Sequence, residues 1–323
     1  MTQNDRINTE THSVCYLCGN HGEVLYHDLK DRLFGAPGEW TFRKCAGSDC
    51  GMVWLDPRPT AADIGKAYRH YYTHGQANHA RQSYAARAVR AMLHTVSTYL
   101  LGLRRERQCY KRMYLDQVPP GRLLEVGCGN GKRLRRLRAL GWDVAGQEID
   151  PVAAEYVRTV KGIPVHLGPL ETIELGEYDV VILSHVIEHV HDPVAMLSTC
   201  HRLLKEKGLL VVLTPNAASL GHRTFGAAWR GLEPPRHLHL FSSRTLKRIA
   251  QQAGFSDPRC WTTPVGAYGI GQNSPSLKGI IQTRQPVTTT CDVLRGFWFQ
   301  VTACVVFLWD KNSGEECVLM VSK

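Results

Sequence analysis

The feature that most constrains the fold is a short apolar run that leads directly into a glycine-dense turn. The segment reads Leu123-Leu124-Glu125-Val126-Gly127-Cys128-Gly129-Asn130-Gly131, and a helical pattern follows it. Glycines at a strand-to-helix turn let the backbone approach a ligand closely, at the carboxyl end of a sheet where α/β proteins bind cofactors. The spacing is Gly-x-Gly-x-Gly, whereas dinucleotide-binding turns read Gly-x-Gly-x-x-Gly. The turn therefore predicts a cofactor site and argues against a nicotinamide-dependent oxidoreductase.

Short apolar runs and helical segments alternate from residue 122 onward. Strands are expected at 123–126, 144–147, 178–184, 209–214, 258–263 and 317–321, and helices at 132–140, 151–161, 193–205 and about 243–253. Strand and helix in alternation imply right-handed βαβ units. The pattern predicts an α/β fold with a doubly wound, mostly parallel sheet.

Three further motifs follow the glycine turn: Asp179-Val-Val-Ile-Leu-Ser184-His185-Val186-Ile187-Glu188-His189, then Leu203-Leu204-Lys205-x-x-Gly208, then Thr214-Pro215-Asn216. With the turn, they resemble the class I methyltransferases that depend on S-adenosylmethionine (SAM), in the branch of ubiquinone-type O-methyltransferases and sugar methyltransferases. The resemblance covers residues 120–260 and implies a Rossmann-like SAM-binding domain.

The resemblance also implies which residues contact SAM. Glu125 suits the cationic amino-acid tail, and Glu148 follows the second strand, where an acid reaches the ribose hydroxyls. Asp150 is expected to cap the next helix. Many relatives hold the adenine with an acid after the third strand, but this chain has Leu170 near that place. The predicted cofactor contacts are Glu125, Gly127, Gly129, Gly131, Glu148, Leu170, Ser184 and His185.

The segment from Glu233 to Ser242 resembles the family's histidine-containing substrate segment. Sugar C-methylating members carry an acid directly before a functional histidine, and here His237 is preceded by Arg236. This replacement favours O-methylation of a sugar, glycan-linked or other small hydroxyl acceptor, with sugar C-methylation as the alternative. His237 and His189 are the candidate catalytic residues, as base or orienting group. The open alternative for each is a hydrogen-bonded packing histidine.

Two cysteine pairs precede these motifs, Cys15 with Cys18 and Cys45 with Cys50. They resemble the zinc module found before some sugar and polysaccharide-cluster methyltransferases. Four thiolates complete a closed tetrahedral site, which makes the expected zinc structural. The alternative is four unrelated buried cysteines. The other seven cysteines, Cys128 among them, are interpreted as small packing residues.

The predicted organisation is a zinc-binding module at 1–60, a basic helical linker at 61–118 and a methyltransferase domain at 119–323 with an insertion at about 264–314. Much of the net charge of +10 lies in an expected amphipathic helix at 81–112. Its basic face is either a solvated surface or a peripheral membrane contact. The longest apolar run, at 297–309, is too short to cross a bilayer unaided. The helix expected at 294–309 is the other candidate for a peripheral contact.

The cysteine content and the polar first eleven residues predict a reducing, cytoplasmic location, with any membrane contact at the inner face. A rival hypothesis is a zinc-ribbon protein that uses its positive charge on nucleic acid and whose methyltransferase fold is non-catalytic. The intact glycine turn, Glu125 and Glu148 argue against this rival. We therefore expect a small or saccharide-linked acceptor as the partner.

Overall fold

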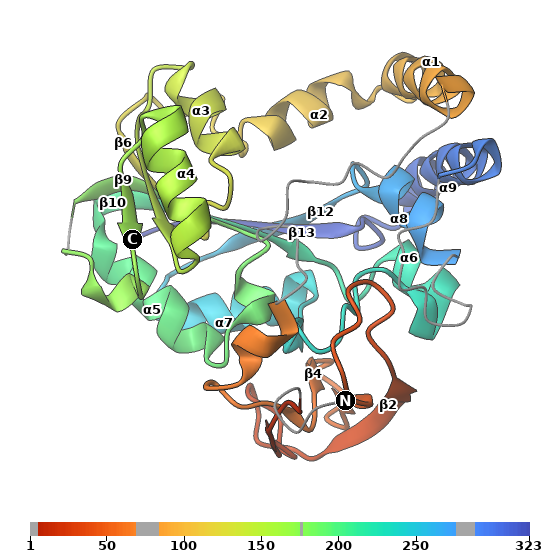
Figure 1. Cartoon of the computed structure of the whole chain (residues 1–323), viewed down its shortest axis with the longest axis horizontal. Helices are drawn as coiled ribbons and strands as arrows, with labels where there is room; N and C mark the ends of the chain where they lie inside the picture. Colours follow the sequence, from red (N-terminus) through yellow and green to blue (C-terminus); the bar gives the residue numbers. More distant parts are fainter. Residues whose placement is uncertain (1–5, 69–83, 175–176, 276–287) are drawn as a thin grey trace. The chain divides into compact units, whose positions relative to one another are not determined.

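The computed structural model describes residues 6–68, 84–174, 177–275 and 288–323 (Figure 1). The chain divides into two compact units, each described by itself below. Unit 1 comprises residues 1–104, 215–245 and 262–316, and unit 2 comprises residues 105–214, 246–261 and 317–323. Each unit combines segments that are separate in sequence, whereas the boundaries predicted at 60 and 118 divide the chain into consecutive modules. Those boundaries stay predictions.

Unit 2 is built on a seven-stranded sheet with the order β12-β13-β10-β9-β6-β7-β8. Its strands are β6 (Arg122–Val126), β7 (Asp143–Glu148), β8 (Val165–Leu167), β9 (Tyr178–Ser184), β10 (Leu204–Pro215), β12 (Arg259–Thr263) and β13 (Glu316–Ser322). The pairs β6/β7, β7/β8, β6/β9 and β9/β10 are all parallel. The strand order reverses between β6 and β9, which is the switch point of a doubly wound sheet. The predicted fold class is thus confirmed.

Two of the longer helices of unit 2 begin at an aspartate that caps them. The helices are α2 (Leu103–Lys111), α3 (Lys132–Arg138), α4 (Pro151–Lys161), η3 (Leu170–Thr172), η4 (Ile187–His189), α5 (Pro193–Leu203) and α7 (Ser243–Gln252). The first residues of α2, up to 104, and of α7, up to 245, belong to unit 1. Asp150 accepts a hydrogen bond from the Val152 amide at 2.9 Å and so caps α4. Asp192 caps α5 in the same way through the Ala195 amide. Asp150 therefore has the structural role that the sequence predicts.

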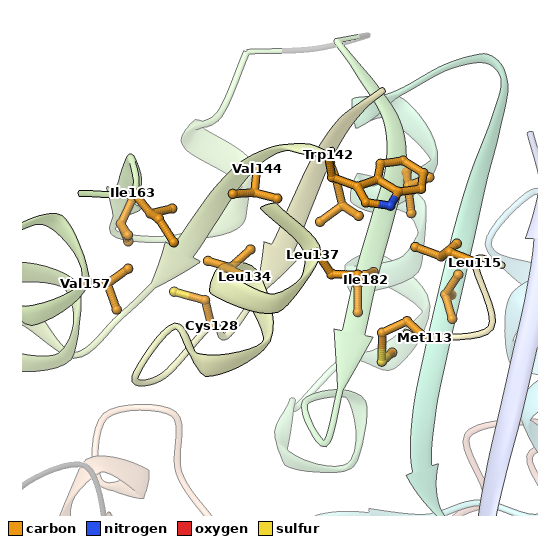
Figure 2. Packing of buried hydrophobic residues seen from close by; sticks show 14 of the residues in the cluster. Met113, Leu115, Cys128, Leu134, Leu137, Trp142, Val144, Val157, Ile163 and Ile182 are labelled. Atoms are coloured by element: carbon orange, nitrogen blue, oxygen red, sulfur yellow. The ribbon is translucent and has the colours of Figure 1, made fainter. Parts of the chain in front are cut away.

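The core of unit 2 lies where α3 and α4 cover the sheet. Figure 2 shows Leu134 and Leu137 of α3 among Val144, Ile182 and Cys128, and all five side chains are buried. Cys128 packs so closely on β7 that a Cβ at Gly146 would meet its Sγ at 2.6 Å. This confirms Cys128 as a packing residue.

Unit 1 contains a four-stranded sheet with the order β11-β4-β3-β2. Its strands are β2 (Gly22–Leu29), β3 (Trp40–Cys45), β4 (Val53–Leu55) and β11 (His239–Leu240), and β1 (Thr9–Glu10) pairs separately with β5 (Arg58–Pro59). The strand β11 pairs antiparallel with β4, although almost two hundred residues separate them. The buried core beside this sheet joins Trp40, Phe42 and Leu55 to Trp229 and Leu238. The N-terminal strands and the histidine-containing segment thus share one sheet and one core.

The remaining elements of unit 1 are helical: η2 (Ile64–Tyr68), α1 (Tyr84–Leu100), α6 (Leu220–Phe225), η5 (Gly226–Ala228), α8 (Ala267–Asn273) and α9 (Thr290–Trp309). The prediction of one helix over 81–112 is wrong. The chain forms α1 and α2 instead, because Gly102 adopts a left-handed conformation with φ of 63° between them. Residues 81–83 of that prediction lie outside the described residues, as do 276–287 of the predicted insertion, whose described part contains α8 and α9.

Candidate functional site

The glycine turn joins β6 to α3 in unit 2. Gly127, Gly129 and Gly131 all have positive φ, at 63°, 52° and 66°. Only glycine adopts this left-handed conformation routinely, so the turn requires these residues for its shape. The Cys128 amide donates to the Gln147 carbonyl at 3.0 Å, which holds the turn against the carboxyl end of β7.

The three glycines differ in what surrounds them. A Cβ at Gly127 would meet Val186 at 2.8 Å, and one at Gly131 would meet Val157 at 3.0 Å. A Cβ at Gly129 would meet no protein atom within 4 Å. Gly127 and Gly131 are therefore also required by packing. The backbone at Gly129 borders open space that a cofactor can approach.

Glu148 ends β7 beside this turn. Its Oε2 accepts from the Gly129 amide at 2.8 Å, while its Oε1 accepts from the amides of Ile149 and Asp150 at 2.9 and 3.1 Å. These bonds fix the carboxylate at the carboxyl ends of β6 and β7, next to the exposed backbone of the turn. This position suits the predicted role of Glu148 on the ribose hydroxyls, which stays a prediction.

Gln147 is a residue of this site that sequence reasoning missed. Its Oε1 accepts from the Gly127 amide at 3.2 Å, and its Nε2 donates to the Gly168 carbonyl at 2.7 Å. The side chain thus links the glycine turn to the loop that precedes Leu170. Leu170 itself is buried in η3. An amide side chain beside an acid carries no motif of its own, so no sequence signal marked it.

Glu125, in β6 two residues before the turn, is buried and pairs with Arg133 of α3. Arg133 also donates to Ser184 Oγ at 2.8 Å, so one guanidinium connects the ends of β6 and β9. Burial raises the pKa of Glu125, although Arg133 acts in the opposite direction. A further cation near this buried carboxylate would be favourable, which agrees with the predicted contact to the cationic tail of SAM. That contact stays a prediction, and Arg133 is an addition that the sequence did not suggest.

The segment after β9 places a buried acid next to two histidines. Glu188 is fully buried, accepts from Thr214 Oγ1 at 3.0 Å and lies 3.4 Å from His185 Nδ1. His185 has a positive φ of 56°, a conformation that is rare outside glycine and that marks a constrained turn. His189 follows in η4 and is half-buried. Unit 2 therefore gathers the predicted residues Ser184, His185 and His189 at the ends of β9 and β10.

The other candidate catalytic residue, His237, belongs to unit 1. It is buried, and its Nδ1 lies 2.8 Å from the Gly231 carbonyl oxygen. A carbonyl oxygen only accepts, so Nδ1 must carry the proton. In the neutral ring Nε2 is then the basic nitrogen. His239 follows two residues later in β11. Its ring packs edge-on against the ring of Tyr16, with the two centroids 4.7 Å apart.

Arg236 is fully buried and held by two acids. Its guanidinium forms two parallel bonds to Asp31 at 2.7 and 3.0 Å, and its Nε donates to Glu233 Oε1 at 3.1 Å. A fourth bond reaches the Ala67 carbonyl at 3.1 Å. Both carboxylates raise the pKa of Arg236 against the effect of burial, so the residue is a fixed cation. Its donors are directed at the protein, which identifies Arg236 as a structural residue beside His237.

The sequence of this chain is similar to those of known methyltransferases. A family model described as "Methyltransferase domain" matches residues 103–257. Two ubiquinone biosynthesis O-methyltransferases from strains of Cereibacter sphaeroides are 35% identical over 130 residues and 33% identical over 176 residues. The first alignment covers 38% of this chain and 53% of the relative, and the second covers 50% and 68%. The chain thus spans between about half and two thirds of the length of these relatives.

The alignment that covers 68% of the relative decides the family. The chain belongs to the SAM-dependent methyltransferases. A SAM-dependent methyltransferase from Thermotoga maritima matches 70% of this chain and 98% of its own, with 18% identity and a TM-score of 0.45. This membership agrees with the expectation of a SAM-dependent enzyme.

The methyltransferase carries its cysteine cluster in unit 1. Cys15 Sγ lies 3.5 Å from Cys50 Sγ, Cys18 Sγ lies 3.4 Å from Cys45 Sγ, and all four sulfurs lie within 4.8 Å of one another. The amides of Leu17 and Gly47 donate to Cys15 and Cys45 at 3.4 Å. Four sulfurs at about 2.3 Å from a central zinc would be separated by comparable distances. The residues present therefore fit a tetrahedral thiolate site.

Gly129→Val tests the cofactor site. The side chain would enter the open space beside Glu148, so SAM affinity should fall by about 1–3 kcal/mol, the usual cost of overpacking. Gly162→Val is the matched control, because Gly162 has a similar φ of 59° and a Cβ there would likewise meet no atom within 4 Å. Both variants should lose similar thermal stability, but calorimetry should find weakened SAM binding only for Gly129→Val. Equal SAM affinity in the two variants would remove the turn from the site.

Proposed function

We propose that this methyltransferase O-methylates a hydroxyl group of a sugar, glycan-linked or other small acceptor, with His237 as the base. The observation that carries the proposal is the bond between His237 Nδ1 and the Gly231 carbonyl at 2.8 Å. It fixes the tautomer in which Nε2 accepts a proton. A hydroxyl acceptor must lose its proton during oxygen methylation, and an imidazole in this state is suited to take it.

The chemistry divides between cofactor and protein. SAM supplies an electrophilic methyl group, and its transfer is an in-line displacement that depends strongly on alignment. The protein has to orient the acceptor hydroxyl and receive its proton. His237 is the candidate for that step, and His189 is a second candidate as an orienting group.

The surroundings of His237 support oxygen as the acceptor atom. The sugar C-methylating members, which the histidine segment resembles, carry an acid directly before the histidine. This chain has Arg236 there, with its donors committed to Asp31 and Glu233. The relatives in Cereibacter sphaeroides are named as O-methyltransferases, which also favours oxygen. The saccharide-linked acceptor rests on the resemblance of the cysteine module and the histidine segment to those of sugar methyltransferases.

A screen of acceptors tests the proposal. Purified protein, SAM and single acceptors drawn from nucleotide sugars, lipid-linked glycans and quinol precursors would be assayed for S-adenosylhomocysteine. We expect turnover with a saccharide hydroxyl and an O-methyl signal in the NMR spectrum of the product. A C-methylated sugar would contradict the assignment of oxygen, and turnover confined to quinols would contradict the saccharide.

Zinc is the second part of the proposal, as a structural ion held by Cys15, Cys18, Cys45 and Cys50. One equivalent per chain is expected by elemental analysis of protein purified in metal-free buffer. Cys15→Ser should lose this zinc and destabilise unit 1. SAM affinity should be retained, because the predicted SAM contacts lie in unit 2. Cys291→Ser, which changes an exposed cysteine of α9, should keep the metal. Wild-type protein without zinc, or an unchanged zinc content in Cys15→Ser, would refute the site.

A further inference from the structure

The helix α9 of unit 1 is apolar on its outward face as well as on its packed face. Val293, Gly296, Gln300 and Ala303 are buried and lie on one side. The large apolar side chains on the other side are between 41% and 88% exposed, and they are Leu294, Trp298, Val305, Leu308 and Trp309. A surface helix of a soluble protein normally places polar residues there. Among the described residues, α9 is the helix long and apolar enough to cross a membrane by length and composition.

The packed face of α9 is committed to protein. Gln300 donates to the Pro264 carbonyl at 2.9 Å and accepts from the Tyr268 amide at 3.2 Å. Gly296 lies so close to α8 that a Cβ there would meet the Tyr268 carbonyl oxygen at 2.8 Å. These contacts hold the middle of α9 against α8 and the Pro264 carbonyl that precedes it. Lipid could therefore reach only the outward face, which is the geometry of an interfacial helix and not of a spanning one.

The helix α1 also exposes large apolar side chains. It packs beside α9 within unit 1, as Figure 1 shows at the upper right. Met92, Tyr99 and Leu100 of α1 are largely exposed. We use the name α1–α9 surface for these three side chains and the five exposed side chains of α9.

Positive charge surrounds this surface. The described helix α1 carries exposed Arg87 and Arg90 and has no acidic residue in its sequence. Arg104 lies over the ring of Tyr99 at 5.8 Å, and Lys311 lies over the ring of Phe307 at 4.6 Å. The cationic groups of Arg104 and Lys311 thus lie over aromatic rings of α1 and α9. Aromatic and basic side chains together are typical of a membrane interface.

The acidic residues at the two ends of α9 are engaged by neighbours. Asp292 closes the capping box with Thr289 and pairs with Arg295, and Asp310 pairs with Arg223 at 3.0 Å. The charge offered to a partner is therefore positive. In a symmetric dimer through this surface, the cations of one copy would face those of the other, which is unfavourable.

We infer that the α1–α9 surface binds the anionic face of a lipid bilayer, with α9 lying in the plane of the headgroups. Exposed tryptophan, leucine and valine supply the apolar contact, and the arginines and lysine supply attraction to anionic lipid. This inference stands independently of the acceptor proposed above, because it rests on residues outside the cofactor and histidine segments.

Vesicle co-sedimentation tests the inference. Wild-type protein should pellet with vesicles that contain roughly 30% phosphatidylglycerol, less with pure phosphatidylcholine, and less again as salt is raised. The triple variant Trp298→Ser, Leu308→Ser, Trp309→Ser should bind about tenfold or more weakly. The matched control is Val152→Ser, Val160→Ser, which removes exposed apolar side chains from α4 of unit 2 and should bind like wild type.

Three outcomes would overturn the inference. Wild-type protein that stays in the supernatant with anionic vesicles would do so, as would a triple variant that pellets like wild type. Light scattering could also find a wild-type dimer that the triple variant converts to a monomer, and that result would assign the surface to a second copy of the chain. Circular dichroism of the triple variant checks that it keeps the helix content of the wild type.

Discussion

Replacing His237 with alanine is expected to lower kcat by about 10²–10⁴-fold, the usual range for losing a general acid–base group. SAM affinity should change little, because His237 is not among the predicted cofactor contacts. The limb of the pH–rate profile that reports the base should disappear as well. Turnover, SAM affinity and melting temperature measured on one preparation provide the test.

His237→Asn separates the two roles of this side chain. Its amide can still donate to the Gly231 carbonyl, which His237 Nδ1 contacts at 2.8 Å, but it cannot act as a base. We expect near-normal stability with the full loss of kcat. His239→Ala is the control for a buried histidine without a catalytic role, and it should lower stability by roughly 1–3 kcal/mol while the folded protein keeps its kcat. A destabilised but fully active His237→Ala protein would show that His237 is a packing residue.

Unit 2 was predictable from sequence because its signals are local. The strand at 178–184 and the helix at 151–161 match the structure residue for residue, since each is bounded by its own turn or cap. The glycine turn, its left-handed backbone and the cap at Asp150 depend on neighbours within a few residues. Periodicity and turn chemistry are sufficient for such features.

The features that sequence reasoning missed depend on contacts between distant parts of the chain. Asp31 and Arg236 are 205 positions apart, and nothing near either residue indicates the other. The pairing of β11 with β4 likewise joins the histidine segment to the cysteine module. Gln147 and Arg133 were missed for a related reason. Gln147 bonds to the loop at Gly168, and Arg133 bonds to Ser184 at the end of β9. Only the folded sheet brings these partners within reach. The prediction of a single helix over 81–112 is wrong because the amphipathic periodicity continues across Gly102, whereas the helical backbone is interrupted by the positive φ of that glycine.

The buried ion pair explains why the histidine segment and the loop after β2 should unfold together. Arg236→Met would leave the carboxylates of Asp31 and Glu233 buried without their cation, and Asp31 also accepts from the amides of Leu33, Phe34 and Ala36. Breaking such a pair typically costs about 3–5 kcal/mol, because an uncompensated buried charge remains. Arg236→Lys should recover only part of this loss, since an ammonium cannot make the two parallel bonds to Asp31.

Arg244→Met provides the matched control for Arg236→Met within the same unit. Arg244 also pairs with an aspartate of the cysteine module, Asp49 at 3.1 Å, but both side chains are largely exposed. An exposed pair contributes about 0–1 kcal/mol, so this variant should unfold in urea almost like wild type. The difference between the two variants measures what burial adds to an arginine–aspartate contact. If Arg236→Met also unfolded like wild type, the buried network could not be what holds the histidine segment in place. The position of His237 would then have to depend on the β11–β4 pairing and on the buried core around Leu238.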